Sequence, residues 1–491
     1  MNASGRYIAG WAIVCLLLLD ACAVGPNYHR PVVPAPPAFS EVATTAHVTI
    51  TPAEEDISTW WTSFQDPVLD DLMRRALADN PDLQIAASRV REARAGERVS
   101  AAAGLPTING TGNALTFNSN RKSSSGADGA SSLGLPIPSH TNLYAVGFDA
   151  SWEVDVFGGV RRSVEAARAN TEAAEWSRRD GQVSLLAEIA NDYLTLRALQ
   201  ARIAIGQAEL QRQKDLFDLI HDRRANGFVT NLDVNQQTGQ VATAAAQIPQ
   251  LTAEAEAQVH ALGVLVGQPP ATLNDELKSA GAPLPTPPPV LAVGLPSDLL
   301  RRRPDIREAE RRVAAANAMI GAHVADLYPK LNLLGLASFA SNSVDGLVAS
   351  DNLQSIAAGL VTVPIFNAGK TRAQIREARE EGTQALLTYR KTILGSFRDV
   401  EDALARYKAE DDRRASLAQA VEASANSLTI AEDQYRVGTV TFINVLNAEN
   451  ALLQTRDQLT QSDAQTLSDL VSLYKALGGG WSVSGKGEPT G

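Results

Sequence analysis

The four residues Gly227-Phe228-Val229-Thr230 recur as Gly438-Thr439-Val440-Thr441, 211 positions further along a chain of 491 residues. Upstream, Asn80-Pro81-Asp82 recurs as Arg303-Pro304-Asp305, and these two copies are 223 positions apart. The chain is therefore one module written twice. The first copy holds 12 more residues, which we place in a loop. Repetition on this scale predicts an architecture with internal pseudosymmetry rather than a catalytic cleft.

Long proline-free stretches surround the repeated glycines, between Pro138 and Pro249 and between Pro364 and Pro489. Both are rich in helix-forming residues, and their apolar side chains recur every three or four positions, as on a polar helical rod with one apolar seam. The first seam consists of Val183, Leu186, Ile189, Tyr193, Leu196 and Leu199.

These patterns predict a helical hairpin at about 159–267 and a second at about 367–477. Gly227 and Gly438 suit the left-handed position that ends a helix. Thr230 and Thr441 suit the N-caps of the two return helices. Pro249 is expected to kink the first return helix.

Each predicted hairpin is preceded by two segments that alternate as β-strands do. From Tyr144 to Val156, aromatic and aliphatic residues alternate with Gly, Ser and acidic residues. The expected strand pairs are about 107–117 with 142–156, and about 330–340 with 355–365. The fold class is therefore mixed α and β, mainly α.

Strands with an apolar outer face and a polar inner face suit a membrane barrel, because every backbone group in lipid must be paired. Four strands cannot close a barrel of useful width, so the chain must then form an oligomer. A soluble antiparallel sheet with one wet face gives the same period and remains an alternative.

The charge balance excludes one class of function, nucleic-acid binding. With 44 Lys+Arg against 55 Asp+Glu, the net charge is −11 at pH 7. Nucleic-acid binding needs a clustered basic excess, so no nucleic-acid partner is expected. The run Arg301-Arg302-Arg303 precedes Pro304 and is interpreted as the end of a short helix that makes surface ion pairs.

The N-terminus has the pattern of a secretion signal, in which Arg6 precedes an apolar run from Tyr7 to Leu19 that is short for a membrane span. The run ends at Leu19-Asp20-Ala21-Cys22, which resembles a bacterial lipobox, although Asp20 is unusual there. We predict a signal peptide at 1–21 and a lipid on Cys22. Ala23 after that cysteine fits delivery to the outer membrane. The alternative is a plain signal peptide with an incidental cysteine.

Composition gives the remaining boundaries. An extended, proline-containing tether is expected at 22–65, and the first repeat at 66–267. A Pro-rich linker at 268–296 leads to the second repeat at 297–478 and a tail at 479–491.

The ordered set of motifs resembles the TolC-type outer-membrane efflux channels, and within them the NodT-like lipoproteins of resistance-nodulation-division pumps. The similarity covers nearly the whole chain. It is carried by Cys22-Ala23-Val24-Gly25-Pro26-Asn27-Tyr28, Trp60-Trp61 with Phe64 and Pro67, Ser151-Trp152-Glu153-Val154-Asp155-Val156-Phe157-Gly158, Leu299 to Arg307 with Ala309-Glu310, Pro364-Ile365-Phe366 and Tyr435-Arg436-Val437-Gly438.

The resemblance implies a homotrimer that pools four strands per chain into one twelve-stranded β-barrel in the outer membrane. The helices would continue as a periplasmic tunnel whose tips contact a periplasmic adaptor protein, which links to a proton-driven inner-membrane transporter. Small molecules such as drugs would pass through. The alternatives are a related channel for type I protein secretion and a periplasmic adaptor lipoprotein.

The resemblance also assigns the hairpin tips to the periplasmic gate and adaptor dock. The residues concerned are Gly227, Gly438, Asp233, Tyr435, Arg436, Asn444 and Asn447. From the residues alone, Asp233 could instead cap a helix with Thr230, and Tyr435 could be packing. Asn444 and Asn447 stand where the family often has acids, and Val440 where some members have a base. Charge-assisted locks should therefore be weaker here.

Enzymatic constellations are absent from the sequence, so neither an enzyme nor a cofactor or metal is expected. The histidines, His29, His47, His140, His221, His260 and His323, lack ligand spacing. No glycine-rich phosphate loop and no Ser-His-acid arrangement occurs.

Overall fold

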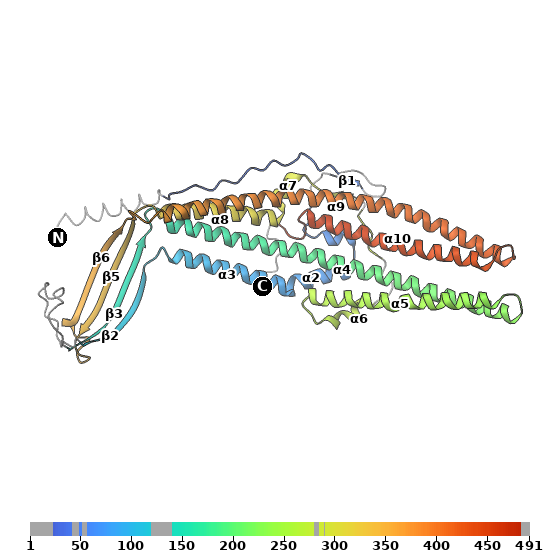
Figure 1. Cartoon of the computed structure of the whole chain (residues 1–491), viewed down its shortest axis with the longest axis horizontal. Coiled ribbons are helices and arrows are strands. Elements are labelled where there is room, and N and C mark those ends of the chain that lie inside the picture. The colour runs from blue at the N-terminus through green and yellow to red at the C-terminus, as the bar shows by residue number, and fades with distance from the viewer. Residues whose placement is uncertain are drawn as a thin grey trace. The chain divides into compact units, whose positions relative to one another are not determined.

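The computed structural model describes residues 23–41, 49–51, 56–118, 140–278, 284–288 and 290–482 (Figure 1). The predicted signal peptide, Cys22, most of the loop between the first two predicted strands and the tail beyond residue 482 lie outside the described residues. In chain order, the elements are β1 (Thr49–Thr51), η2 (Trp60–Phe64), α2 (Pro67–Asp79), α3 (Pro81–Ala102), β2 (Thr107–Asn118), β3 (His140–Val154), α4 (Gly159–Ala225), α5 (Asn231–Leu265), η4 (Pro270–Leu273), α6 (Asn274–Leu277), β4 (Val290–Ala292), α7 (Pro296–Arg302), α8 (Pro304–Ala325), β5 (Lys330–Ser341), η5 (Ser350–Asn352), β6 (Leu353–Thr362), α9 (Lys370–Arg436) and α10 (Phe442–Ala476).

The chain forms two compact units. The first comprises Met1–Arg30, Glu92–Thr171 and Arg311–Leu386, and it holds the four long strands. The second comprises Pro31–Arg91, Glu172–Glu310 and Leu387–Gly491, and it holds the greater part of both helical hairpins.

The long strands form one antiparallel sheet in the order β2-β3-β5-β6 (Figure 1). All four predicted strands are confirmed, with shifted ends. β3 ends at Val154 because the Val156 N–H turns back to the Val154 carbonyl, 2.8 Å away. β6 ends at Thr362, two residues before Pro364, which cannot donate a ladder hydrogen bond.

The predicted two-sided pattern is clear on β3 and weaker on the second strand pair. Val146 and Phe148 share a face with their β5 partners Phe339 and Ala337, because directly opposed residues in an antiparallel ladder point the same way. Asp149 lies on the other face. Leu336 and Leu334, the β5 partners of Asp149 and Ser151, bring apolar side chains to that face.

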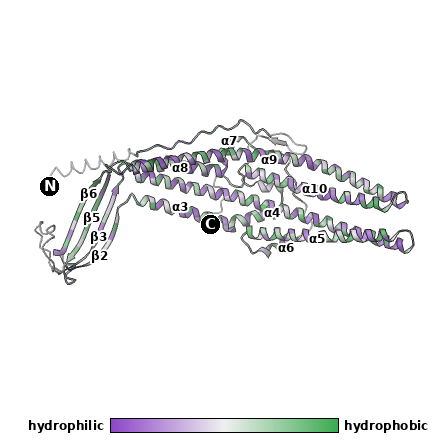
Figure 2. Cartoon of the chain, viewed as in Figure 1, coloured by the Kyte–Doolittle hydropathy of each residue, from purple (hydrophilic) through white to green (hydrophobic). Residues whose placement is uncertain are grey.

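Each hairpin pairs a helix of 67 residues with a return helix of 35 residues, so the sequence repeat is also a repeat of helix length. Polar and apolar residues mix along these helices (Figure 2). No described helix combines the length and apolarity needed to cross a membrane. α5 is one continuous helix through Pro249.

Gly227 and Gly438 end α4 and α9 as predicted, with φ of 80° and 78°. In both turns the glycine N–H and the next N–H bond to carbonyls three and five residues back: Gly227 to Arg224 and Phe228 to Arg223, at 3.0 and 2.9 Å, and likewise after α9. This is the Schellman arrangement, which satisfies carbonyls at a helix end and requires a left-handed residue.

The second unit has its core where the tether meets the helices. Trp60 stacks on Tyr474 with ring centroids 5.1 Å apart, and Phe64 packs edge-on against Trp60. The buried Tyr193 hydroxyl donates to the Asp66 carboxylate at 2.5 Å. The predicted extended tether is therefore wrong at its end, because η2 buries its aromatic side chains here.

The Pro-rich linker also contains short regular elements rather than extended chain alone. Its strand β4 pairs in parallel with β1 of the tether, from Thr49–Val290 to Thr51–Ala292. Main-chain hydrogen bonding from the tether thus fixes part of the linker within this unit.

Candidate functional site at the hairpin tips

The first tip is organised by a capping box. The Asp233 carboxylate accepts from the Thr230 N–H at 2.8 Å and from its hydroxyl at 2.7 Å, and the Asp233 N–H points back to the Thr230 hydroxyl. Arg224 at the end of α4 donates to the Asn231 side chain at 2.8 Å. Within one chain, Asp233 is therefore a helix-capping acid.

The second tip lacks that box. Thr441 occupies the N-cap of α10, as predicted, but its hydroxyl makes no capping hydrogen bond. The reason is the residue three positions later, where Asn444 takes the place that Asp233 has in the first copy. A neutral amide is a weaker partner than a carboxylate for a helix N-terminus. Asn444 and Asn447 are both exposed.

Tyr435 lies in the second tip and is half-buried. Its ring is 5.6 Å from that of Phe442, and the Arg223 guanidinium of the other hairpin lies over it at 5.3 Å. Arg436 is exposed and pairs with Asp433 at 3.1 Å. Among the described contacts, no hydrogen bond joins Asp233 to Tyr435.

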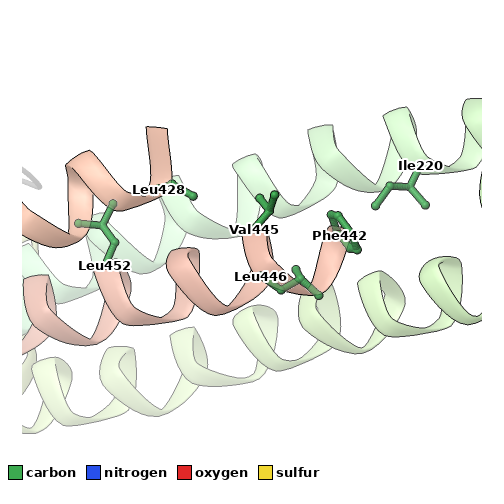
Figure 3. Packing of buried hydrophobic residues seen from close by; sticks show 6 residues of the cluster. All are labelled: Ile220, Leu428, Phe442, Val445, Leu446 and Leu452. Carbon is green, nitrogen blue, oxygen red and sulfur yellow. The ribbon is translucent and has the colours of Figure 1, made fainter. Parts of the chain in front are cut away.

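An apolar cluster packs the two tips together (Figure 3). Ile220 comes from α4, Leu428 from α9, and Phe442 with its neighbours from α10, all in the second unit. Tyr435, Val229 and Val234 pack against this cluster. The buried members are Ile220, Leu428, Phe442, Val445, Leu446 and Leu452.

A buried polar layer, which the sequence analysis missed, joins α4, α5 and α10. Gln237, fully buried, donates to the Gln213 carbonyl at 2.8 Å and to its side chain at 2.6 Å. Gln213 donates to Glu209 at 2.6 Å, and Arg212 bridges Glu209 and Glu449.

Burial raises the pKa of the Glu449 carboxyl, against the opposing effect of Arg212. The signal for this layer was present in the sequence. Glu209 and Gln213 stand four positions apart and therefore on one face of α4.

The N-terminal segment docks on the first unit instead of hanging free. The Val24 N–H donates to the Phe157 carbonyl at 3.1 Å. Arg162, 5% exposed, donates to the Val24 carbonyl at 3.2 Å and to the Asn27 side chain at 2.7 Å. Asn317 of α8 donates to the Pro26 carbonyl at 3.1 Å. The predicted lipid position, Cys22, directly precedes this docked segment.

Two glycines permit the docking. A Cβ on Gly25 would lie 2.4 Å from the Gly321 Cα, and a Cβ on Gly321 would lie 2.9 Å from the Arg162 side chain. Gly25 also has a φ of 94°, which favours glycine. The absence of side chains at Gly25 and Gly321 therefore lets the main chain of the tether contact the main chain of α8.

The interpretation of the arginine run as surface ion pairs holds for Arg301, which is exposed and pairs with Asp298. It is wrong for Arg303. That guanidinium is largely buried and binds Asp305 through two nitrogens at 3.0 and 2.7 Å, Asp399 at 3.3 Å and the Ala476 carbonyl at 2.9 Å. Beside it, burial and the charge of Asp305 raise the pKa of Asp180 to about 6, although Arg303 opposes this.

Within the described residues, no group of three His, Cys, Asp or Glu side chains could hold a metal ion. The tips instead offer exposed apolar side chains around ordered turns, namely Phe228, Leu232, Val437 and Ile443. Such a surface suits contact with another protein.

Comparison with known proteins identifies the family of the chain. A family model described as outer membrane efflux protein matches residues 72–268 and 295–479. The pyoverdine export outer membrane protein OpmQ of Pseudomonas aeruginosa is 33% identical over 88% of this chain and 89% of its own length. Nodulation protein T of Rhizobium leguminosarum is 30% identical over 96% of this chain and 97% of its own length. The solved structure of the outer-membrane channel OprN is 33% identical, has a TM-score of 0.84 and covers 94% of this chain and 100% of its own.

Proposed function

The chain belongs to the outer membrane efflux protein family, and from that premise we propose that three copies assemble into the exit duct of a tripartite efflux pump. It is an outer-membrane efflux channel with a periplasmic helical extension. We infer that the duct conducts passively and performs no chemistry itself.

The observation that supports the proposed trimer is that the four-stranded sheet has two open edges. Its four strands run in the order β2-β3-β5-β6, so in the described chain β2 and β6 each have one edge without a partner strand. In lipid, an unpaired edge costs several kcal/mol for each backbone group, so the sheet must close. Three copies supply twelve strands, a number that leaves a conducting lumen.

The partners follow from this assembly. We propose that a periplasmic adaptor binds the hairpin tips, where Phe228 and Val437 are 79% and 74% exposed. The adaptor would link the duct to an inner-membrane transporter of the resistance-nodulation-division type.

The cargo is proposed to be small molecules. Relatives that match this chain carry names that specify pyoverdine export, toluene efflux and cation efflux. A shared channel with such different cargoes fits a wide, passive conduit. A channel for protein secretion is the second candidate, and an adaptor lipoprotein is disfavoured by the duplicated strand pairs.

We also propose that Cys22 carries the lipid anchor. The docked segment that begins at Ala23 supports this proposal, because it fixes the chain directly after the cysteine. Mass spectrometry of the mature N-terminus should find a diacylglyceryl-modified, acylated cysteine. A mature chain that begins at another residue would exclude it.

The gate is proposed to lie at the tips, with Tyr435 and the apolar cluster as its main elements and Asp233 as a capping acid that can also face a neighbouring copy. Gly227 and Gly438 shape the turns, and Arg436, Asn444 and Asn447 lie on their exposed surface.

Chemical crosslinking of the full chain in mild detergent tests the assembly. We expect bands of one, two and three copies, with the trimer as the limit. A monodisperse monomer that retains its strand content would overturn the membrane-barrel proposal. A gene pair for a transporter and an adaptor beside this gene would favour efflux over protein secretion.

A further inference from the structure

We propose that β6 of one copy pairs with β2 of a second copy in one defined register, with Thr362 opposite Thr111 and Val361 opposite Gly112. This inference rests on the proposed trimer and specifies its seam. It follows from three properties of the sheet: the composition of its edges, the direction of its strands and the agreement between the sequence repeat and the strand register.

The two edge strands lack the protection that free edges usually carry. Natural proteins guard an exposed edge with charged side chains or proline, because it would otherwise recruit another strand. β2 (TINGTGNALTFN) and β6 (LQSIAAGLVT) contain neither. The charges lie on the inner strands, as Asp149 and Glu153 on β3 and Lys330 on β5. Both edges therefore have the composition of paired strands.

The strand directions permit closure. All three pairings within the sheet are antiparallel, so β2 and β6, at opposite ends of four strands, run in opposite directions. When β6 meets β2 of the next copy, the new pair is again antiparallel. An even number of strands per copy makes this pattern continuous around a ring.

The sequence repeat predicts the strand register where the register can be checked. Thr107 faces Ser151 in the β2–β3 pair. Shifting Thr107 by 223 positions and Ser151 by 211, the two repeat spacings, gives Lys330 and Thr362. These two residues are indeed partners in the β5–β6 pair. The repeat therefore conserves pairing as well as sequence.

The same two shifts, applied to the β3–β5 pair, predict the register of the pair between β6 of one copy and β2 of the next. In the β3–β5 pair, the second strand of the first repeat pairs with the first strand of the second repeat. The equivalent pair joins β6, the second strand of the second repeat, to β2, the first strand of the first repeat in the next copy. Ser151 faces Leu334, which gives Thr362 facing Thr111, and Ala150 faces Gly335, which gives Val361 facing Gly112. Trp152 faces Leu333, and the same shifts would bring Val363, one residue beyond the end of β6, next to Gly110.

The side chains fit this register. Val361, the partner of Leu331, is 66% exposed in the single chain and lies on the apolar face of the sheet. Val363, 50% exposed, directly follows the end of β6. Opposite them stand glycines: a Cβ on Gly112 would meet nothing within 4 Å, and one on Gly110 would only touch the Phe148 ring at 3.8 Å. Two branched side chains thus meet two positions with open space. A slip by one residue would turn every side chain to the wrong face.

Disulfide trapping tests the register. Cysteines that replace directly opposed residues lie about 4.5–5.5 Å apart at Cα, within reach of a disulfide. A slip of two residues adds about 6.8 Å along the strand and puts the pair out of reach. The double variant Thr362→Cys with Thr111→Cys is therefore compared with Thr362→Cys combined with Asn109→Cys or Asn113→Cys. All three partner positions lie on the same face of β2.

The full-length variants are oxidised in outer-membrane vesicles and separated without reductant. We expect the Thr111 pair to form covalent trimers at least about tenfold faster than either control pair. Faster trapping through Asn109 or Asn113 would overturn the register but leave the trimer intact. Trimers seen by chemical crosslinking without any disulfide product would show that β6 and β2 do not form the seam. Absence of trimers in every variant and in the parent chain would refute the proposed assembly, and the seam with it.

Discussion

Replacing Arg162 by methionine should release the N-terminal segment from the first unit. The side chain is 5% exposed and holds the tether through the Val24 carbonyl and the Asn27 side chain, at 3.2 and 2.7 Å. A hydrogen bond to a charged group contributes roughly 1.5–3 kcal/mol, so the loss of two should cost about 3–6 kcal/mol. Methionine retains most of the packing volume against Gly321, so the effect reports mainly on the hydrogen bonds.

That loss should raise the opening equilibrium constant of the docked segment by a factor of about 100 or more, since each 1.4 kcal/mol is tenfold. Hydrogen exchange of the full-length protein in detergent measures it. The Val24 amide, which donates to the Phe157 carbonyl, should lose its protection in the variant. Asn27→Ala, which removes one of the two contacts, should have an intermediate effect.

Arg202→Met is the matched control. It removes another arginine from α4, whose guanidinium binds Asp457 of α10 at 2.6 Å rather than the tether. If residues 23–30 exchange equally fast in the Arg162 and Arg202 variants, or if neither differs from the parent chain, then Arg162 does not hold the tether and the reasoning fails.

Three further predictions concern the tips and the second unit. Gly438→Val should cost about 1 kcal/mol or more, because the residue has a φ of 78°, which strains a branched side chain. A Cβ there would meet nothing within 4 Å, so the cost comes from the backbone and not from a clash. Substrate efflux should decline while crosslinked trimers persist, with Thr439→Val as control; unchanged efflux would contradict a role of the tip. Tyr435→Phe combined with Asp233→Ala should raise single-channel conductance in planar bilayers, and unchanged conductance and open probability would reduce Asp233 to a capping acid and Tyr435 to packing. Asp180→Asn should stabilise the protein at pH 7 by about 1–3 kcal/mol, because a carboxyl whose pKa is raised to about 6 weakens the fold when it is ionised. The folded state binds the Asp180 proton more tightly than the unfolded state does, so the parent chain loses stability as pH rises from about 4 to 6. Thermal melting should therefore show that the difference in stability between the parent chain and the Asp180→Asn variant vanishes below about pH 4. A constant difference at all pH values would contradict the assignment.

The sequence by itself determined the repeating architecture. Glycines at 227 and 438, the proline-free stretches and the alternation from Tyr144 to Val156 act locally, through the backbone angles and the side-chain periods of single elements. For that reason both hairpins and all four long strands could be predicted. Once the structure gives the register of β2 with β3, the two repeat spacings also give that of β5 with β6. The candidate tip residues were found in the same way, since a turn that needs glycine marks its own position.

Only the tertiary structure decided what individual polar side chains do. The sequence placed Arg303 in a surface run and indicated no role for Arg162 or Gln237. Folding put Arg303 between Asp305 and Asp399, Arg162 against the tether, and Gln237 in a buried layer with Gln213. The same holds for Tyr435, whose neighbours Arg223 and Phe442 come from different hairpin segments. A hydrogen bond or an ion pair joins residues that can be hundreds of positions apart. Its energy depends on burial and distance, and neither quantity exists until the elements have packed.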